Sequence, residues 1–136
     1  MGYTWEYSVH QLLVRVLIVD DFEKWRRYVH STVEQIHDVE VVGEAADGLE
    51  AIQKAKDLQP DLILLDIGLP GLNGIEVARR LSTISPESKI IFFTENRSLE
   101  IKQEALRAGG SAYVIKSNSE SELIAAINAL LKRRGS

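Results

Sequence analysis

The chain of 136 residues contains no cysteine, which excludes disulfide bonds, cysteine metal sites and cysteine nucleophiles. It has no apolar run near the roughly 20 residues that span a bilayer, and its first residues lack the basic and apolar stretches of a secretory signal. It also lacks an excess of basic residues, because 16 Lys and Arg against 20 Asp and Glu give a net charge of −4. We therefore expect a cytoplasmic protein with no membrane partner and no direct contact between this segment and nucleic acid.

The composition that remains is typical of one folded domain. Hydrophobic residues make up 45% of the chain and charged residues 26%, which argues against disorder and low complexity. We expect a single domain over residues 14–134, preceded by an N-terminal extension over 1–13 that contains Tyr3, Trp5 and Tyr7. Two interpretations of the extension stay open, a short helix packed on the domain or a frayed tail, and we favour the tail.

Short apolar runs alternate along the chain with segments of helical periodicity. The runs predict five strands, at Val14–Val19, Val39–Ala45, Leu62–Leu65, Ile90–Phe93 and Ala112–Ile115. A helix is predicted over Phe22–Ile36, and apolar residues three or four apart predict one more after each later strand. The central runs are apolar without alternation, as in strands that are covered on both faces. We therefore expect an α/β fold, a five-stranded parallel sheet that is doubly wound with helices on both sides.

Polar side chains follow four of these strands at the point where each one ends. Asp20 and Asp21 follow the first strand, Asp66 the third, Thr94 the fourth and Lys116 the fifth. Because open parallel sheets bind ligands beyond the carboxyl ends of their strands, we expect these groups to converge on one edge. Each alone has a structural explanation, since an aspartate after a strand commonly caps the next helix. Together they do not, because neighbouring carboxylates repel one another unless a cation is present.

The chemistry of this group indicates both a metal ion and an anion. Carboxylate oxygens without nearby histidine or cysteine favour Mg²⁺ over zinc or copper. A lysine and a hydroxyl directed at the same place indicate that a negatively charged group also binds there, and a phosphoryl group is the candidate. An aspartate in that arrangement can act as the nucleophile and form an aspartyl phosphate.

Four segments of the chain match one known family. They are Leu17–Phe22 (LIVDDF), Leu64–Gly74 (LLDIGLPGLNG), Phe93–Thr94 (FT) and Tyr113–Lys116 (YVIK). Because these segments occur in this order, the chain from residue 14 to 132 resembles the receiver domain of bacterial two-component response regulators. It is most similar to the receivers that precede a LuxR-type helix-turn-helix domain. The resemblance implies the flavodoxin-like (βα)5 receiver fold. It also implies a phosphoacceptor switch rather than an enzyme that turns over a separate substrate.

The resemblance implies a role for each acidic residue at the strand ends. Asp66 is expected to be the phosphoacceptor, and a sensor histidine kinase is the expected donor. Asp21 is expected to bind Mg²⁺ directly and Asp20 through water. Asp66 itself and the backbone carbonyl of Gly68 are the further expected ligands of the ion.

Three other side chains are expected to respond to the phosphoryl group. Lys116 would pair with Asp66 at rest and with a phosphoryl oxygen afterwards. Thr94 would swing to donate a hydrogen bond to that group, and Tyr113 would turn inward behind it. The surface around the fourth helix and fifth strand would change and control an output. A homodimer formed on phosphorylation would pair either through the fourth helix, fifth strand and fifth helix or through the first and fifth helices, and both alternatives stay open. We expect that output to be transcription, through a DNA-binding domain that this chain does not contain.

A few positions depart from the family pattern. Glu95 stands where a small residue is usual, and adds a carboxylate either at the phosphoryl entrance or in solvent. Gly68 leaves space for water beside the phosphoryl group, and Asn96 would either orient that water or have no effect. Ser117 stands where many receivers have proline, so the isomer of the Lys116–Ser117 bond stays open.

Three other functions fit these residues less well. A phosphatase of the haloacid-dehalogenase type needs an aspartate two residues after the nucleophile, where Gly68 stands. A nucleotide or flavin binder needs a Gly/Ser/Thr-rich phosphate loop after the first strand, where Asp20–Glu23 (DDFE) would repel phosphate. A receiver reduced to a docking module would not need the complete set of site residues.

Overall fold

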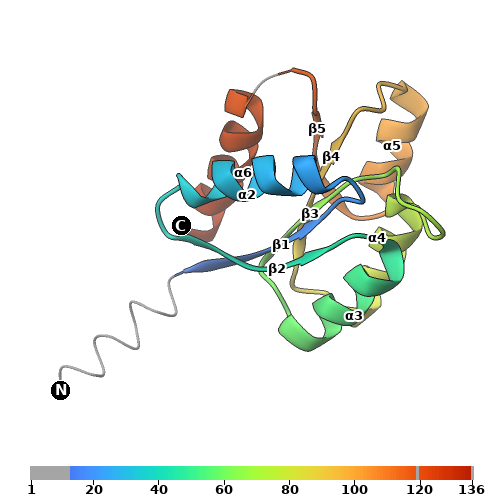
Figure 1. Ribbon diagram of the computed structural model, residues 1–136, viewed down its shortest axis with the longest axis horizontal. Coiled ribbons are helices and arrows are strands. Elements are labelled where there is room, and N and C mark those ends of the chain that lie inside the picture. The colour runs from blue at the N-terminus through green and yellow to red at the C-terminus, as the bar shows by residue number, and fades with distance from the viewer. Residues whose placement is uncertain (1–12, 119, 136) are drawn as a thin grey trace.

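The computed structural model describes residues 13–118 and 120–135 (Figure 1). Residues 1–12, which make up nearly all of the predicted N-terminal extension, lie outside the described residues. The strands are β1 (Val14–Val19), β2 (Val39–Ala45), β3 (Leu62–Leu65), β4 (Lys89–Thr94) and β5 (Gly110–Ile115). The helices are α2 (Glu23–Glu34), α3 (Gly48–Leu58), α4 (Gly74–Ile84), α5 (Leu99–Arg107) and α6 (Glu120–Gly135). No helix in this described part of the chain is both long enough and apolar enough to cross a membrane.

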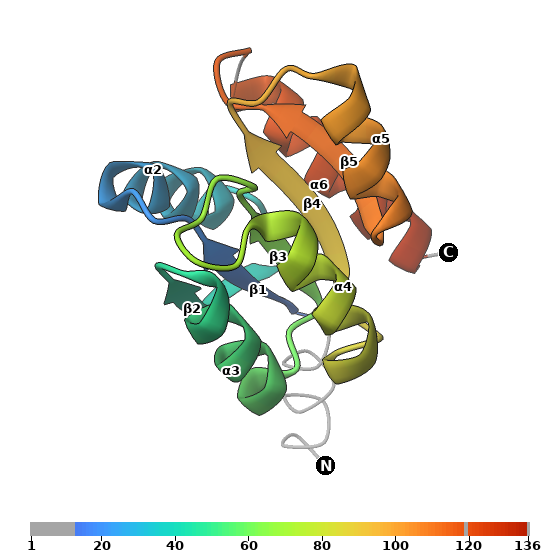
Figure 2. The ribbon, with the colours of Figure 1, turned by 90° about the vertical axis from the view of Figure 1, so that its right-hand side faces the viewer.

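The strands form one parallel sheet in the order β2-β1-β3-β4-β5. Helices α2 and α6 cover one face of the sheet, and α3, α4 and α5 cover the other (Figures 1 and 2). The structure thus confirms the predicted doubly wound α/β fold. The chain changes direction across the sheet between β1 and β3, and such switch points are where sheets of this kind bind ligands.

The central strands are buried on both faces because their alternate residues enter two apolar layers. Leu17 and Ile63 pack into the layer with α3, α4 and α5, whereas Ile18 and Leu64 pack into the layer with α2 and α6. All four side chains are almost completely inaccessible to solvent. Burying each such side chain contributes about 1.5–3 kcal/mol, so the strands that end at the site are firmly anchored.

Side-chain caps start three of the helices but not the one that follows the acidic pair. Asp47, Asn73 and Ser98 each accept a hydrogen bond from a backbone N–H in the first turn of α3, α4 and α5. The cap position of α2 is occupied by Phe22, whose side chain makes no cap bond. Neither residue of the acidic pair therefore caps α2, although Asp20 Oδ1 accepts a 2.9 Å hydrogen bond from the N–H of Phe22.

An ionic network connects α2 to β2 and to the loop after β1. The Nδ1 atom of His30 lies 2.8 Å from Glu44 Oε2, and its Nε2 atom lies 2.8 Å from Glu34 Oε1. Arg26 contacts Glu44 at 3.3 Å and donates a 2.8 Å hydrogen bond to the backbone carbonyl of Asp20. The hydrogen bond with Glu44 is the main cause that raises the pKa of His30 above its ordinary value of 6.5.

The raised pKa of His30 predicts a pH dependence of stability. Its stabilising contribution is complete below the ordinary value of 6.5 and is lost as the pH rises through the higher folded-state pKa. The imidazole is 34% exposed, so we expect an effect below about 1 kcal/mol. Urea unfolding over a pH series should show the decline in wild type and its loss in His30→Gln. His37→Gln, at a side chain that is 97% exposed, should keep the wild-type decline. An equal decline in His30→Gln and wild type would contradict this assignment.

Candidate functional site

A cleft of about 680 Å³ opens at the carboxyl edge of the sheet. It is lined by residues that follow β1, β3, β4 and β5, together with the start of α2. All five strand-end residues that we predicted to converge line it, namely Asp20, Asp21, Asp66, Thr94 and Lys116. Gly68 lines it as well, whereas Tyr113 is not among the lining residues. The structure therefore confirms the predicted convergence at this edge.

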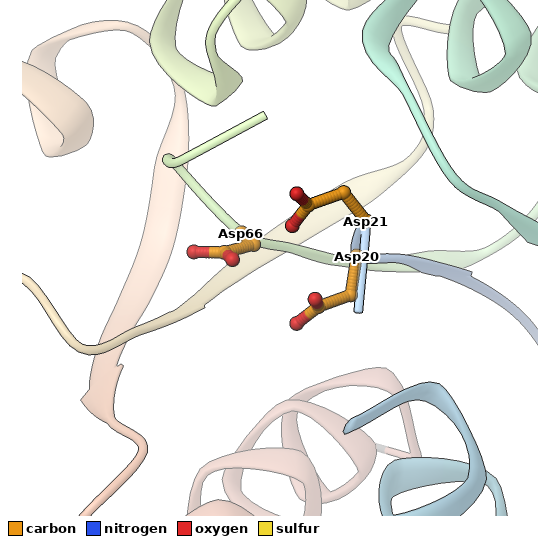
Figure 3. A group of neighbouring side chains, drawn as sticks. All are labelled: Asp20, Asp21 and Asp66. Carbon is orange, nitrogen blue, oxygen red and sulfur yellow. The ribbon is translucent and has the colours of Figure 1, made fainter. Parts of the chain in front are cut away.

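Three carboxyl groups lie together in the cleft. Asp20 and Asp21 extend from the end of β1 and Asp66 from the end of β3 (Figure 3). Each offers an oxygen atom, and these atoms lie within 4.8 Å of one another. Asp20 and Asp66 are buried, while Asp21 is exposed and leaves one side of the group open to solvent. A set of carboxylate oxygens with an open side fits a hard cation such as Mg²⁺, which keeps several water ligands.

The ammonium of Lys116 partly compensates this negative charge. Its Nζ atom lies 2.5 Å from Asp20 Oδ2 and 3.0 Å from Asp66 Oδ2, and its side chain is 4% exposed. Burial raises the pKa of Asp20, and the hydrogen bond from Lys116 opposes that effect. One buried cation thus faces two buried carboxylates and an exposed third, so the cleft can accept further positive charge.

Backbone contacts hold Asp66 in place on both sides. Its N–H donates a 3.0 Å hydrogen bond to the carbonyl of Val19 in β1, and its Oδ1 accepts one of 3.3 Å from the N–H of Gly68. Gly74, at the start of α4, donates a 2.8 Å hydrogen bond to the carbonyl of Ile67. A Cβ atom on Gly74 would lie 2.1 Å from the carbonyl oxygen of Asp66. The residue at this position must therefore be glycine for α4 to approach Asp66 so closely.

Thr94 and Tyr113 are both connected to the loop after β4. The hydroxyl of Thr94 accepts a 3.3 Å hydrogen bond from the N–H of Asn96, and the carbonyl of Thr94 accepts one of 2.8 Å from the N–H of Lys116. Tyr113 is half-buried, and its hydroxyl donates a 2.8 Å hydrogen bond to the carbonyl of Asn96. Burial raises the pKa of Tyr113, and the negative charge of Asp66 adds to the effect. A movement of this loop would therefore change the hydrogen bonds of both side chains.

The structure answers several questions that the sequence left open. Glu95 is exposed and is among the residues that line the cleft, in keeping with either position considered for its carboxylate. The side-chain oxygen of Asn96 accepts a 2.9 Å hydrogen bond from the N–H of Ser98, so it is engaged within its own loop. A Cβ atom on Gly68 would meet no heavy atom within 4 Å, in keeping with space beside Asp66. The Lys116–Ser117 peptide bond is trans.

Sequence analysis did not predict two aromatic residues of the cleft. Phe22 and Trp25 both line it, from the start of α2. Trp25 also packs against the apolar layer between the sheet and helices α2 and α6. Its ring centroid also lies 4.9 Å from Lys116 Nζ. The available signal was its place in the first turn of a helix that begins directly after the acidic pair.

Comparison with known proteins identifies the family. The sequence model described as "Response regulator receiver domain" matches residues 16–128. The chain belongs to the response regulator receiver domain family. Receiver domains are the phosphoacceptor switches of two-component signalling. This receiver is 34% identical over 120 residues to the transcriptional regulatory protein LiaR of Bacillus subtilis (strain 168), which covers 88% of the chain and 57% of LiaR. The chain thus spans little more than half the length of that relative.

Solved structures show the same fold in close relatives of the receiver. A LuxR-family two-component response regulator from Aurantimonas sp. SI85-9A1 superposes with a TM-score of 0.84 at 34% identity, over 88% of this chain and 86% of that chain. The isolated REC domain of RcsB from Salmonella enterica serovar Typhimurium, in the presence of phosphomimetic BeF3-, gives a TM-score of 0.84 at 28% identity. It covers 88% of this chain and 89% of that one. The resemblance to receivers of the LuxR type is thereby confirmed.

Proposed function

We propose that this receiver accepts a phosphoryl group on Asp66 from a sensor histidine kinase, with Mg²⁺ bound in the same cleft. The observation that carries the proposal is the position of Lys116, whose ammonium lies 3.0 Å from Asp66 Oδ2 inside a cluster of three carboxylates. Asp20, Asp21, Asp66 and the carbonyl of Gly68 would hold the ion. Phosphomimetic BeF3- is present in the structure of the RcsB receiver, which supports the same chemistry here.

The transfer exchanges one bond at phosphorus for another. A carboxylate oxygen of Asp66 forms the new P–O bond while the P–N bond to the donor histidine breaks, and the electron pair of that bond stays on the imidazole. Lys116 then pairs with a phosphoryl oxygen in place of the carboxylate. Mg²⁺, when bound, supplies positive charge next to the oxygens of the transferring group. Later attack by water on phosphorus restores Asp66 and releases inorganic phosphate.

The phosphoryl group would change the surface formed by α5 and β5. Thr94 would swing to donate a hydrogen bond to a phosphoryl oxygen, and this movement would remove its hydroxyl from the hydrogen bond that it accepts from the N–H of Asn96 in the loop after β4. Tyr113 is tied to the carbonyl of Asn96 in that loop and follows it inward. This is a two-state element whose balance a local change of charge shifts. The altered surface would support a homodimer.

The output of the switch is proposed to be control of transcription. LiaR is named as a transcriptional regulatory protein, and the Aurantimonas structure is of a LuxR-family regulator. The receiver itself has a net charge of −4, so DNA contact would belong to a DNA-binding domain and not to this segment. Phosphorylation would then act on DNA binding through the α5 and β5 surface.

The proposal is tested by treating the full chain with acetyl phosphate and Mg²⁺ and measuring its intact mass. We expect a gain of one phosphoryl group that hydroxylamine removes, because acyl phosphates react with it. Asp66→Asn should show no gain, whereas Asp57→Asn, at an exposed position on α3, should behave as wild type. A gain of mass in Asp66→Asn would contradict the proposal. So would a wild-type protein that gains no phosphoryl group from acetyl phosphate and none from phosphoramidate. Sustained release of phosphate from many esters would indicate a phosphatase instead.

A further inference from the structure

The ammonium of Lys116 has a third neighbour besides the two carboxylates. An ammonium has three N–H donors. Asp20 Oδ2 lies at 2.5 Å, Asp66 Oδ2 at 3.0 Å, and the centroid of the Trp25 ring lies 4.9 Å from Nζ. The lysine side chain is 4% exposed, so the indole face occupies a side from which water would otherwise solvate the charge. A cation is attracted to an indole face, and more strongly where water is excluded.

The ring of Trp25 is held by residues outside the acidic cluster. It meets Phe93 of β4 edge-on, with centroids 5.7 Å apart and an interplanar angle of 83°. It meets Tyr28 of α2 in the same manner, at 5.5 Å and 90°. Such T-shaped contacts stabilise a defined ring orientation. We therefore expect the indole to keep its orientation when a cation or a phosphoryl group binds to the carboxylates.

We propose that Trp25 is a positioning residue for phosphoryl transfer, whose indole face keeps the ammonium of Lys116 in the cleft when its carboxylate partners are engaged elsewhere. This inference rests on the proposed function. Asp20 and Asp66 are the ion-pair partners of Lys116 and also members of the metal-binding cluster. Both therefore turn toward other charges during transfer. The indole carries no charge and belongs to neither the metal-binding cluster nor the phosphoryl acceptor. It therefore stays available to the ammonium when both carboxylates are engaged.

Loss of the indole should lower the rate of phosphoryl transfer without lowering the affinity for Mg²⁺. Without Trp25 the ammonium can leave the cleft once its carboxylate partners are engaged, so the phosphoryl oxygens lose its charge and transfer slows. An ammonium that leaves also repels a bound cation less, so Mg²⁺ should bind at least as tightly as in wild type. A general disturbance of the cleft would instead weaken both.

The contact itself can be tested without metal or phosphate. A proton above an aromatic ring is shielded by the ring current, so the ε-methylene protons of Lys116 should resonate upfield of an ordinary lysine in the NMR spectrum of wild type. Trp25→Leu should move them to the ordinary position, and Trp25→Phe should retain part of the shift. Asp57→Asn, at an exposed position on α3, should leave the shift in place.

The functional part of the test measures Mg²⁺ affinity by calorimetry and the rate of phosphorylation by acetyl phosphate at saturating Mg²⁺. We expect Trp25→Leu to be phosphorylated about tenfold more slowly, within the range expected for a buried cation–π contact. Its Mg²⁺ affinity should be unchanged or higher. Trp25→Phe should recover much of the rate, because a phenyl ring also attracts a cation. Asp57→Asn should react at close to the wild-type rate.

The outcomes separate this inference from the proposed function. If wild type gains no phosphoryl group, the proposed function fails and the role of Trp25 in transfer fails with it. If wild type reacts and Trp25→Leu reacts at the same rate, only the role of Trp25 is overturned. A parallel loss of rate and Mg²⁺ affinity in Trp25→Leu that phenylalanine does not restore also overturns it, because that pattern indicates a purely structural residue.

Discussion

Replacing Gly74 with alanine should lower the free energy of unfolding by about 3 kcal/mol or more. The added Cβ would lie 2.1 Å from the carbonyl oxygen of Asp66 and 2.8 Å from the Cα of Ile67. Both are backbone atoms, so no side-chain rotation relieves the overlap. Either the start of α4 must move and lose the hydrogen bond from the N–H of residue 74 to the carbonyl of Ile67, or the segment that carries Asp66 must shift. Thermal unfolding followed by circular dichroism should show a fall in Tm of roughly 10 °C.

Gly68→Ala is the matched control for this prediction, because Gly68 lies in the same loop. A Cβ atom there would meet no heavy atom within 4 Å, so we expect a change within about 0.5 kcal/mol. If Asp66 accepts the phosphoryl group as proposed, its displacement in Gly74→Ala should also slow the reaction with acetyl phosphate more than Gly68→Ala does. Similar stabilities of the two variants would show that the close approach of α4 to Asp66 does not constrain this loop.

Replacing Lys116 with methionine should produce a second large effect. Methionine keeps most of the apolar stem but leaves Asp20 and Asp66 buried without their ammonium partner. Removing one partner of a buried ion pair typically costs about 3 kcal/mol or more, and we expect a loss of that size at neutral pH. Urea unfolding with and without Mg²⁺ measures it. Added Mg²⁺ should restore part of the stability, because a cation that binds only the folded cluster shifts the equilibrium toward it.

Lowering the pH should also reduce the loss in the free energy of unfolding caused by Lys116→Met. Burial already holds the pKa of Asp20 above its ordinary value of 3.8 in the folded protein. The cost of the buried charge is therefore present above the folded-state pKa and disappears as the pH falls through it. Lys102→Met, at an exposed position on α5, should change stability by less than about 0.5 kcal/mol at any of these pH values. A Lys116→Met protein as stable as wild type without Mg²⁺ would contradict the charge balance described for the cleft.

The strand arrangement could largely be predicted from the sequence, because strands buried on both faces are apolar runs. The structure has the predicted bounds for β1, β2 and β3. The predictions for β4 and β5 were too short, since Lys89, Thr94, Gly110 and Ser111 belong to the strands but fall outside the apolar runs. The predicted helix over Phe22–Ile36 is also shorter in the structure, at Glu23–Glu34. Polar ends of elements carry no apolar signal, so their bounds escape this kind of analysis.

Part of the site could be predicted from the order of the strands along the chain, and part depends on how side chains pack. The convergence of the strand-end residues follows from topology, because parallel strands end at one edge, and the structure confirms it. Their individual roles stay predictions. The contact between Trp25 and Lys116 joins an α2 side chain to the end of β5, and helical periodicity gives a face of the helix without saying how deep each residue lies. The connection of His30 to Glu44 escaped prediction for the same reason.

A magnesium titration by calorimetry tests most directly whether the acidic cluster is a cation site. We predict one Mg²⁺ bound per wild-type chain, and binding at least about tenfold weaker in Asp21→Asn, whose exposed side chain makes the substitution structurally mild. Asp57→Asn, which removes an exposed carboxylate far from the cluster on α3, should bind as wild type does. No saturable binding to wild type, or equal binding by wild type and Asp21→Asn, would contradict the account.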